Sequence, residues 1–238
     1  MKYFFSSLLV ALCWCLLPSA AAPQDKSPAS GSLEAVLEKM DQASANFHTT
    51  QAEFEWDRYE KVIDEVDDIQ SGTIYYRRSG KDKDIEMMAD ITKPDRKYVL
   101  FSDGKIRVYQ PKVDQVTLYD AGKNKTEVET YLVLGFGGSG EEMQKSFTVT
   151  YLGPETINGV ATAKLQLVPK SEKVRNTFAK ILLWIDLDRG ISVQQQFFEP
   201  QGDYRLAKYS SIKVNDKISN DVFQLKTNGK TQTISPRG

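Results

Sequence analysis

The sequence holds very few of the residues on which most catalytic and metal-binding chemistry depends. Of 238 residues, only Cys13 and Cys15, both inside an apolar run near the start, are cysteine, and only His48 is histidine. This scarcity excludes catalytic Cys–His pairs, cysteine-rich or multi-histidine metal sites and disulfide bonds in the rest of the chain. One base remains for a Ser–His triad, and no Gly-x-Ser-x-Gly motif accompanies it. We therefore expect no enzymatic activity, no bound metal and no cofactor.

An excess of charge of one sign is also missing. The chain has 31 Lys and Arg against 32 Asp and Glu, a net charge of −1. Because nucleic-acid binders normally carry a basic excess, we expect no nucleic-acid partner. With 40% hydrophobic and 26% charged residues, the composition is that of an ordinary globular protein and excludes a disordered one.

No hydrophobic run is long enough for a comfortable transmembrane helix. Lys2 precedes an apolar stretch over residues 3–17, and small residues at 19–22 follow it. The stretch is shorter than the roughly 20 residues that span a bilayer, and the pattern is typical of a secretory signal peptide. We expect residues 1–22 to be removed by cleavage near Ala21 or Ala22, and residues 23–31 to form a linker in an exported protein.

The periodicity of apolar residues changes once along the mature chain. Residues 33–48 repeat with helical spacing behind a Ser32 N-cap, which predicts one amphipathic helix with His48 in a structural role at its C-terminal end. Alternating patterns then predict about ten strands with short turns: near 54–56, 74–76, 97–101, 105–110, 115–119, 147–152, 161–168, 180–187, 191–198 and 204–214. Such a series predicts a mainly β (α+β) fold with one curled antiparallel sheet, a single domain over 32–230 and a basic tail over 231–238.

Two polar segments invite a functional interpretation, and for each the structural one is stronger. The glycine-rich stretch 135–140 lacks the Lys-Ser/Thr of a phosphate-binding loop and is followed by Glu141 and Glu142, so we interpret it as a flexible connection. If the flanking segments are short helices, the glycines would be the hinge of a small lid. The acidic run at 64–68 has no calcium-loop spacing and predicts a solvated hairpin tip.

The sequence leaves open what fills the apolar concave face of this sheet. Either side chains fill the interior, or they leave a cavity for a hydrophobic guest.

Short segments in a fixed order resemble the periplasmic outer-membrane lipoprotein carrier family, the LolA-like proteins. The matching segments are the helix ending at Phe47, then 72–78 (Gly-Thr-Ile-Tyr-Tyr-Arg-Arg), 102–105, 108–111, 113–115, 184–186, 189–191, 209–212 and 220–223. Their order and spacing cover most of the mature chain.

The resemblance implies an incomplete antiparallel barrel whose apolar concave face is covered by an N-terminal amphipathic helix and short lid helices. It implies a periplasmic carrier that shields the acyl chains of a lipoprotein or related lipid, with an inner-membrane release complex and an outer-membrane acceptor as partners. Arg78 occupies the position of the family's lid latch, with Arg77 on the preceding basic site. As cavity-wall candidates we take Phe54, Trp56, Ile74, Tyr76, Val99, Phe101 and Leu183. The alternative is a periplasmic envelope sensor or interaction module on the same fold.

Overall fold

The computed structural model describes residues 31–79, 84–122 and 125–236. The expected signal peptide and nearly all of the expected linker lie outside these residues. No helix within the described ranges combines the length and apolar character needed to cross a membrane.

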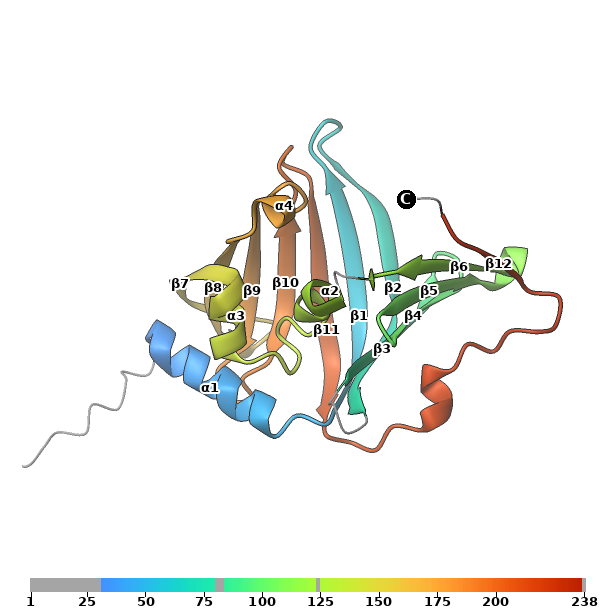
Figure 1. The fold of residues 1–238 in the computed structure, drawn as a ribbon. Helices are drawn as coiled ribbons and strands as arrows, with labels where there is room; N and C mark the ends of the chain where they lie inside the picture. The colour runs from blue at the N-terminus through green and yellow to red at the C-terminus, as the bar shows by residue number, and fades with distance from the viewer. Residues whose placement is uncertain (1–30, 80–83, 123–124, 237–238) are drawn as a thin grey trace, which may run out of the picture.

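One twelve-stranded sheet forms most of the molecule (Figure 1). Its order is β12-β6-β5-β4-β3-β2-β1-β11-β10-β9-β8-β7, and every neighbouring pair is antiparallel except β12 with β6. The strands are β1 Thr49–Glu60, β2 Glu65–Ser79, β3 Asp84–Lys93, β4 Lys97–Ser102, β5 Lys105–Gln110, β6 Gln115–Asp120, β7 Phe147–Ile157, β8 Val160–Pro169, β9 Lys180–Asp186, β10 Ser192–Phe198, β11 Tyr204–Val214 and β12 Gln232–Ile234. The two ends of the sheet, β7 and β12, do not pair, so the expected incomplete barrel is confirmed.

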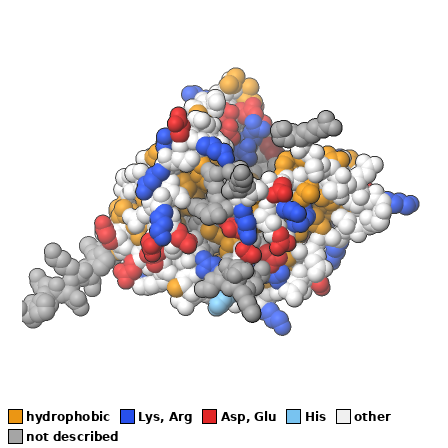
Figure 2. Space-filling model, viewed as in Figure 1, with side chains coloured by type: hydrophobic (Ala, Val, Ile, Leu, Met, Phe, Trp, Pro, Cys, Tyr) orange, Lys and Arg blue, Asp and Glu red, His pale blue; other side chains and the backbone are white. Residues whose placement is uncertain are grey.

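The strands differ from the expected ones in two places. Asp84–Lys93 forms β3, which the alternation did not predict, and residues 232–234 of the expected tail pair in parallel with β6. β1 and β2 make a long hairpin whose tip exposes Val62 and Ile63, seen at the top of Figures 1 and 2. The acidic run starts at this exposed tip with Asp64, as the sequence indicated, and continues into β2, where Asp68 is half-buried.

Helix α1, Leu33–Ala45, begins where the sequence placed it. The Ser32 side chain accepts a hydrogen bond from the backbone N–H of Ala35, and the buried face carries Val36, Leu37 and Met40. The helix ends three residues earlier than expected, because the chain turns to enter β1, where the backbone N–H of His48 donates to Asn215 Oδ1 at 2.8 Å. His48 is consequently not part of the helix, and Figure 2 shows it at the surface in pale blue.

Three helices cover the concave face of the sheet: α1, α2 (Lys125–Leu132) and α3 (Gly140–Ser146) (Figure 1). Over β7–β9 the helices α1 and α3 and the sheet share one core, which we call the filled half. Its buried members are Val36, Leu37, Met40, Leu134, Met143, Phe147, Ala163, Leu165, Leu167, Ile181, Leu183 and Ile185. Over β1–β5 and β11 the cover is α2, and we call this region the cavity half. A further short helix, α4 (Glu172–Arg175), follows β8.

The convex face of β2–β4 is covered by the segment after β11. Phe223, in the 3₁₀ turn Asn220–Phe223, packs on Met88 and Leu100. β3 is therefore buried on both faces, with Met87 and Ile91 on the concave side. In the sequence, Met88 alone interrupts the alternation of apolar and polar residues over 84–92, because Phe223 covers it on the convex side.

Candidate ligand cavity and lid

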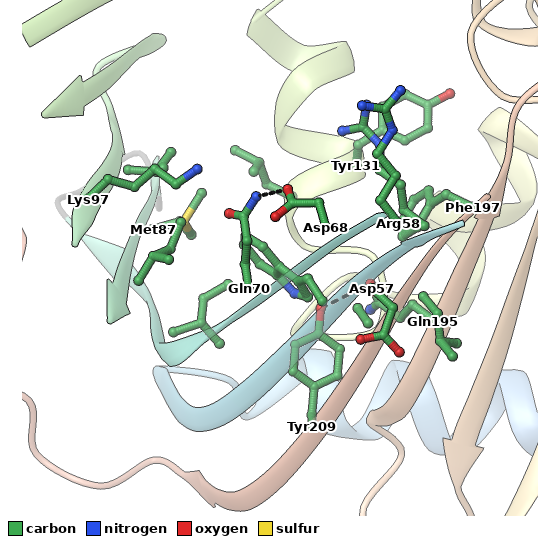
Figure 3. A pocket seen from close by; sticks show the side chains of 18 of the residues that line it. Asp57, Arg58, Asp68, Gln70, Met87, Lys97, Tyr131, Gln195, Phe197 and Tyr209 are labelled. Carbon is green, nitrogen blue, oxygen red and sulfur yellow. Dashed lines mark hydrogen bonds between the residues drawn. The ribbon is translucent and has the colours of Figure 1, made fainter. Parts of the chain in front are cut away.

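A cavity of about 490 Å³ lies between α2 and the concave face of the cavity half (Figure 3). Most of the lining comes from alternate residues of each strand, because successive side chains of a strand point to opposite faces. Its apolar lining is Trp56, Ile74, Tyr76, Met87, Ile91, Val99, Val108, Tyr131, Leu132, Phe197, Leu206, Ala207 and Tyr209. This volume lies within the roughly 300–1,000 Å³ range of small-molecule sites, enough for one ligand of modest size.

The deep end of the cavity has no charge. Tyr76 and Tyr209 are buried, and burial raises the pKa of each phenol, so both stay neutral at physiological pH. The Tyr209 hydroxyl donates to Gln195 Oε1 at 3.3 Å, and Gln195 Nε2 donates to the Leu134 carbonyl at 2.5 Å. These bonds satisfy the buried polar atoms within the wall itself and leave an apolar floor.

The opposite end of the cavity is polar. Arg58, Asp68, Gln70, Lys97 and Arg205 line it. Figure 3 shows Lys97 on one side and Arg58 on the other, with Asp68 and Gln70 between them. The cavity is therefore amphipathic from end to end.

The glycine-rich segment between α2 and α3 is packed into the structure, which corrects its interpretation as a flexible connection. Phe136 is fully buried, stacked on Tyr76 with ring centroids 5.4 Å apart and edge-on to Tyr209 at 4.6 Å. A Cβ at Gly137 would lie 2.6 Å from the Phe47 ring, and one at Gly135 would lie 2.4 Å from the Ser192 side chain. The glycines are needed for close approach, because any larger residue would push the loop off the sheet.

Arg78 joins this loop to the end of α1. Its Nη1 donates to the Ser44 carbonyl at 2.9 Å, and its Nη2 donates to the Gly137 carbonyl at 2.6 Å and to Ser44 Oγ at 3.2 Å. The Ser44 hydroxyl donates to the same Gly137 carbonyl at 2.7 Å, and the guanidinium lies 5.5 Å from the Phe47 ring centroid. One planar cation therefore joins the C-terminal end of α1 to the glycine-rich loop.

Arg77 faces the other side of the sheet. Its Nε pairs with Glu86 at 2.5 Å, its Nη1 donates to Asn220 Oδ1 at 2.6 Å, and its guanidinium lies 4.1 Å from the Phe223 ring centroid. Of the two arginines predicted as a lid latch, only Arg78 contacts the glycine-rich loop, because neighbours in a strand point to opposite faces.

The predicted wall residues divide into two groups. Trp56, Ile74, Tyr76 and Val99 line the cavity. Phe54 and Phe101 are buried in the same hydrophobic cluster but are not among the lining residues, whereas Leu183 belongs to the filled half.

Several residues of the site escaped the sequence reasoning. No local pattern marks Ser44 or Gln195, whereas Phe136 and Gly137 lie in the glycine-rich stretch that the sequence analysis interpreted as a connection. In the sequence Phe136 is only one aromatic residue between glycines. That position in a glycine-rich loop was the one available hint that the loop packs.

A second cavity, of about 730 Å³, is bounded by α1, α3 and α2, with Arg78, Met40 and Glu129 among its lining residues. α2 is tied to β3 where Lys125 Nζ pairs with Asp84 at 2.9 Å. Burial raises the pKa of Glu129, an effect that the nearby Lys125 only partly offsets.

The described residues contain no group of three or more His, Cys, Asp or Glu side chains placed to hold a metal ion.

An incomplete β-barrel with a helix-covered apolar cavity defines a class of proteins suited to hydrophobic ligands. Within that class, the family model "Outer membrane lipoprotein carrier protein LolA" matches residues 40–226, and the chain belongs to this family. The resemblance drawn from the sequence is thereby confirmed. No curated protein sequence matches the chain.

Solved structures share the fold at low sequence identity. A crystal structure of MucB is 14% identical with a TM-score of 0.53, covering 84% of this chain and 65% of that one. The Pseudomonas aeruginosa MucA/MucB complex contains a chain that is 15% identical with a TM-score of 0.50, at 81% and 60% coverage. An uncharacterized conserved protein from Thermus thermophilus is 10% identical with a TM-score of 0.53, at 85% and 98%. The chain thus spans about three fifths to two thirds of the first two of these chains, and all three similarities establish the fold alone.

Proposed function

We propose that this protein is a periplasmic carrier that shields an acyl chain of a lipoprotein or related lipid and passes it towards the outer membrane. The observation that carries the proposal is the Arg78 contact with both Ser44 and Gly137, together with the cavity under α2, whose apolar floor the protein leaves unfilled. Family membership supports the same function. The signal-peptide pattern at residues 1–22 supports export to the periplasm.

A carrier must hold an apolar chain in water and also release it. Each methylene group removed from water contributes about 0.8 kcal/mol, so a long chain in a rigid, fully closed site would leave too slowly. The Arg78 hydrogen bonds stabilise the closed, empty arrangement of α1 and the glycine-rich loop. Closure then competes with the bound chain, and a partner that favours the closed state would drive release.

The cargo is tested by native mass spectrometry and lipid extraction of the protein purified from its own cell envelope. We expect acylated species bound to the wild type and lost from Val108→Trp, which fills the cavity from β5. Val66→Trp is the matched control, because Val66 is 46% exposed on the neighbouring hairpin. A wild-type protein free of acylated species that also fails to solubilise an acylated lipoprotein would overturn the proposal.

The latch is tested by transfer kinetics. Arg78→Leu should fold and load but release its cargo about tenfold more slowly or worse, because the closed empty state loses charge-assisted hydrogen bonds. Arg77→Leu is the control on the other face and should leave release unchanged. Unchanged transfer by Arg78→Leu would remove this residue from the mechanism.

The second candidate function is that of an envelope sensor or interaction module. The Pseudomonas aeruginosa MucA/MucB complex favours it, since there this fold occurs in a complex of two proteins. A sensor would keep its cargo when offered an acceptor, whereas a carrier would hand it over. The transfer assay therefore separates the two functions.

A further inference from the structure

The polar end of the cavity carries an excess of positively charged side chains, two of which lie where they repel each other. Arg58 on β1 lies directly opposite Arg205 on β11 in the register of the sheet. Both side chains line the cavity, as does Lys97 on β4. Like charges directly opposite one another on a sheet are destabilising.

The neighbouring anions do not fully compensate these cations. Asp68, opposite Arg58 on β2, accepts a hydrogen bond from Gln70. Arg58 pairs with Glu60 at 3.0 Å, but its buried Nε has no hydrogen-bond partner among the described residues. Arg205 is 61% exposed and lies 3.5 Å from Glu199, and such an exposed pair contributes little.

Two other charged groups at this end, Asp57 and Lys97, also contribute to its net charge. Asp57 also borders the cavity, and its Oδ2 is bound by Lys208 at 2.7 Å. Lys97 has no ion pair in the part of the chain that the structure describes. The polar end therefore presents three lining cations, Arg58, Lys97 and Arg205, against two lining carboxylates, of which Asp57 is already bound by Lys208.

We propose that the polar end of the cavity is an anion site for the headgroup of a single-chain amphiphile, a carboxylate or phosphate, whose alkyl tail occupies the apolar floor. The inference rests on the proposed function and names its ligand class. The tail would lie against Trp56 and Val99, and the headgroup would bridge Arg58 and Arg205 with Lys97 across from it. A bound anion would relieve the repulsion between the opposed arginines, and guanidinium groups suit both headgroups because each accepts paired hydrogen bonds.

The experiment compares palmitate, hexadecyl phosphate and hexadecanol, which share one alkyl chain and differ in charge. Binding is followed by the emission of Trp56, which lines the cavity, in a Trp184→Phe background, because Trp184 packs in a separate cluster. We expect both anions to bind at least about tenfold more tightly than the alcohol at low salt, and this ratio to shrink at high salt. Tighter binding of one anion assigns the headgroup as carboxylate or phosphate.

Variants distinguish a headgroup site from a general effect of charge. Arg58→Met and Arg205→Met should each bring the anion-to-alcohol ratio close to one while alcohol binding persists. Arg96→Met is the matched control, because Arg96 is exposed, pairs with Asp90 and is not among the residues that line the cavity. Without ligand, Arg205→Met should also melt higher than the wild type, since it removes one of two opposed charges.

The outcomes separate this inference from the function on which it rests. Equal binding of all three ligands, or an unchanged ratio in both Arg58→Met and Arg205→Met, would overturn the anion site and leave an acyl-chain carrier intact. Failure of all three to bind would overturn both.

Discussion

The two halves of one concave face differ in what covers them. Over β7–β9, side chains from α1 and α3 pack directly on the sheet, and Leu165, Ile181 and Leu183 have no exposed surface. Over β1–β5 the cover is the helix α2, and a cavity of about 490 Å³ remains beneath it. The strands of both halves present apolar residues, so the difference arises from the helices and not from the sheet. The cavity half still has a core of its own, in which Phe101 and Phe136 are fully buried, and its cavity lies between that core and α2.

The largest expected effect comes from removing the same side chain from each half. Leu165→Ala should lower the free energy of unfolding by about 2–5 kcal/mol, because the packed surroundings leave a cavity. Leu132→Ala, at the cavity wall on α2, should cost less than about 1.5 kcal/mol, because part of its surface already faces empty space. Urea denaturation measures both values. Equal losses would mean that the cavity half is packed as tightly as the other.

The next effect is at the loop that separates the halves. Gly137 has φ +94° and the Phe47 ring against its Cβ position, whereas Gly159, at φ +82°, has open space there. Gly159→Ala should cost about 1–2 kcal/mol for the left-handed backbone alone. Gly137→Ala should cost about 2–4 kcal/mol, because overpacking is added to that strain. If the two variants were equally stable by urea denaturation, the loop would not be seated as described.

The sequence could predict the sheet but not this division. Turns such as Asp103-Gly104 and Asn158-Gly159, and the alternation of β4–β11, depend on local backbone preferences that a sequence carries. Which half is filled depends on where α1 and α3 lie, and on contacts such as Gly140 against Leu37, which are far apart in the sequence. Arg78 could be proposed only through the family resemblance. Its partners, Ser44 and Gly137, are brought to it by tertiary structure.

A smaller effect is expected from enlarging a side chain in each half. Ala163→Leu, fully buried on β8, should destabilise the protein by about 1–3 kcal/mol, as overpacked cores do. Ala207→Leu, which points into the cavity from β11, should be close to neutral in thermal unfolding while weakening alkyl-chain binding. A large loss of stability from Ala207→Leu would show that the cavity has no room for a larger side chain at this position of its wall.

The smallest effect concerns pH, and its sign should be opposite in the two halves. Burial raises the pKa of Glu129 on α2 above its ordinary 4.5, so the folded state binds this proton more tightly than the unfolded state. Its contribution to stability is therefore greatest at low pH and is lost as pH rises through the folded pKa. Asp186 ends β9 beside the filled half. Although burial opposes its ionisation, hydrogen bonds from Arg189 and from the backbone N–H groups of Arg189 and Asp188 outweigh burial and lower its pKa.

The stability that Asp186 contributes is consequently present above its unfolded pKa and lost as pH falls through the folded one. Denaturation of Glu129→Gln should therefore show a smaller fall in stability than the wild type as pH rises from about 4.5 to about 7. Asp186→Asn should be less stable than the wild type near neutral pH, with a deficit that shrinks below about pH 4. Parallel pH profiles for wild type and Glu129→Gln would mean that α2 leaves this carboxyl in contact with water. The cover of the cavity half would then differ from that of the filled half in its solvation as well as in its packing.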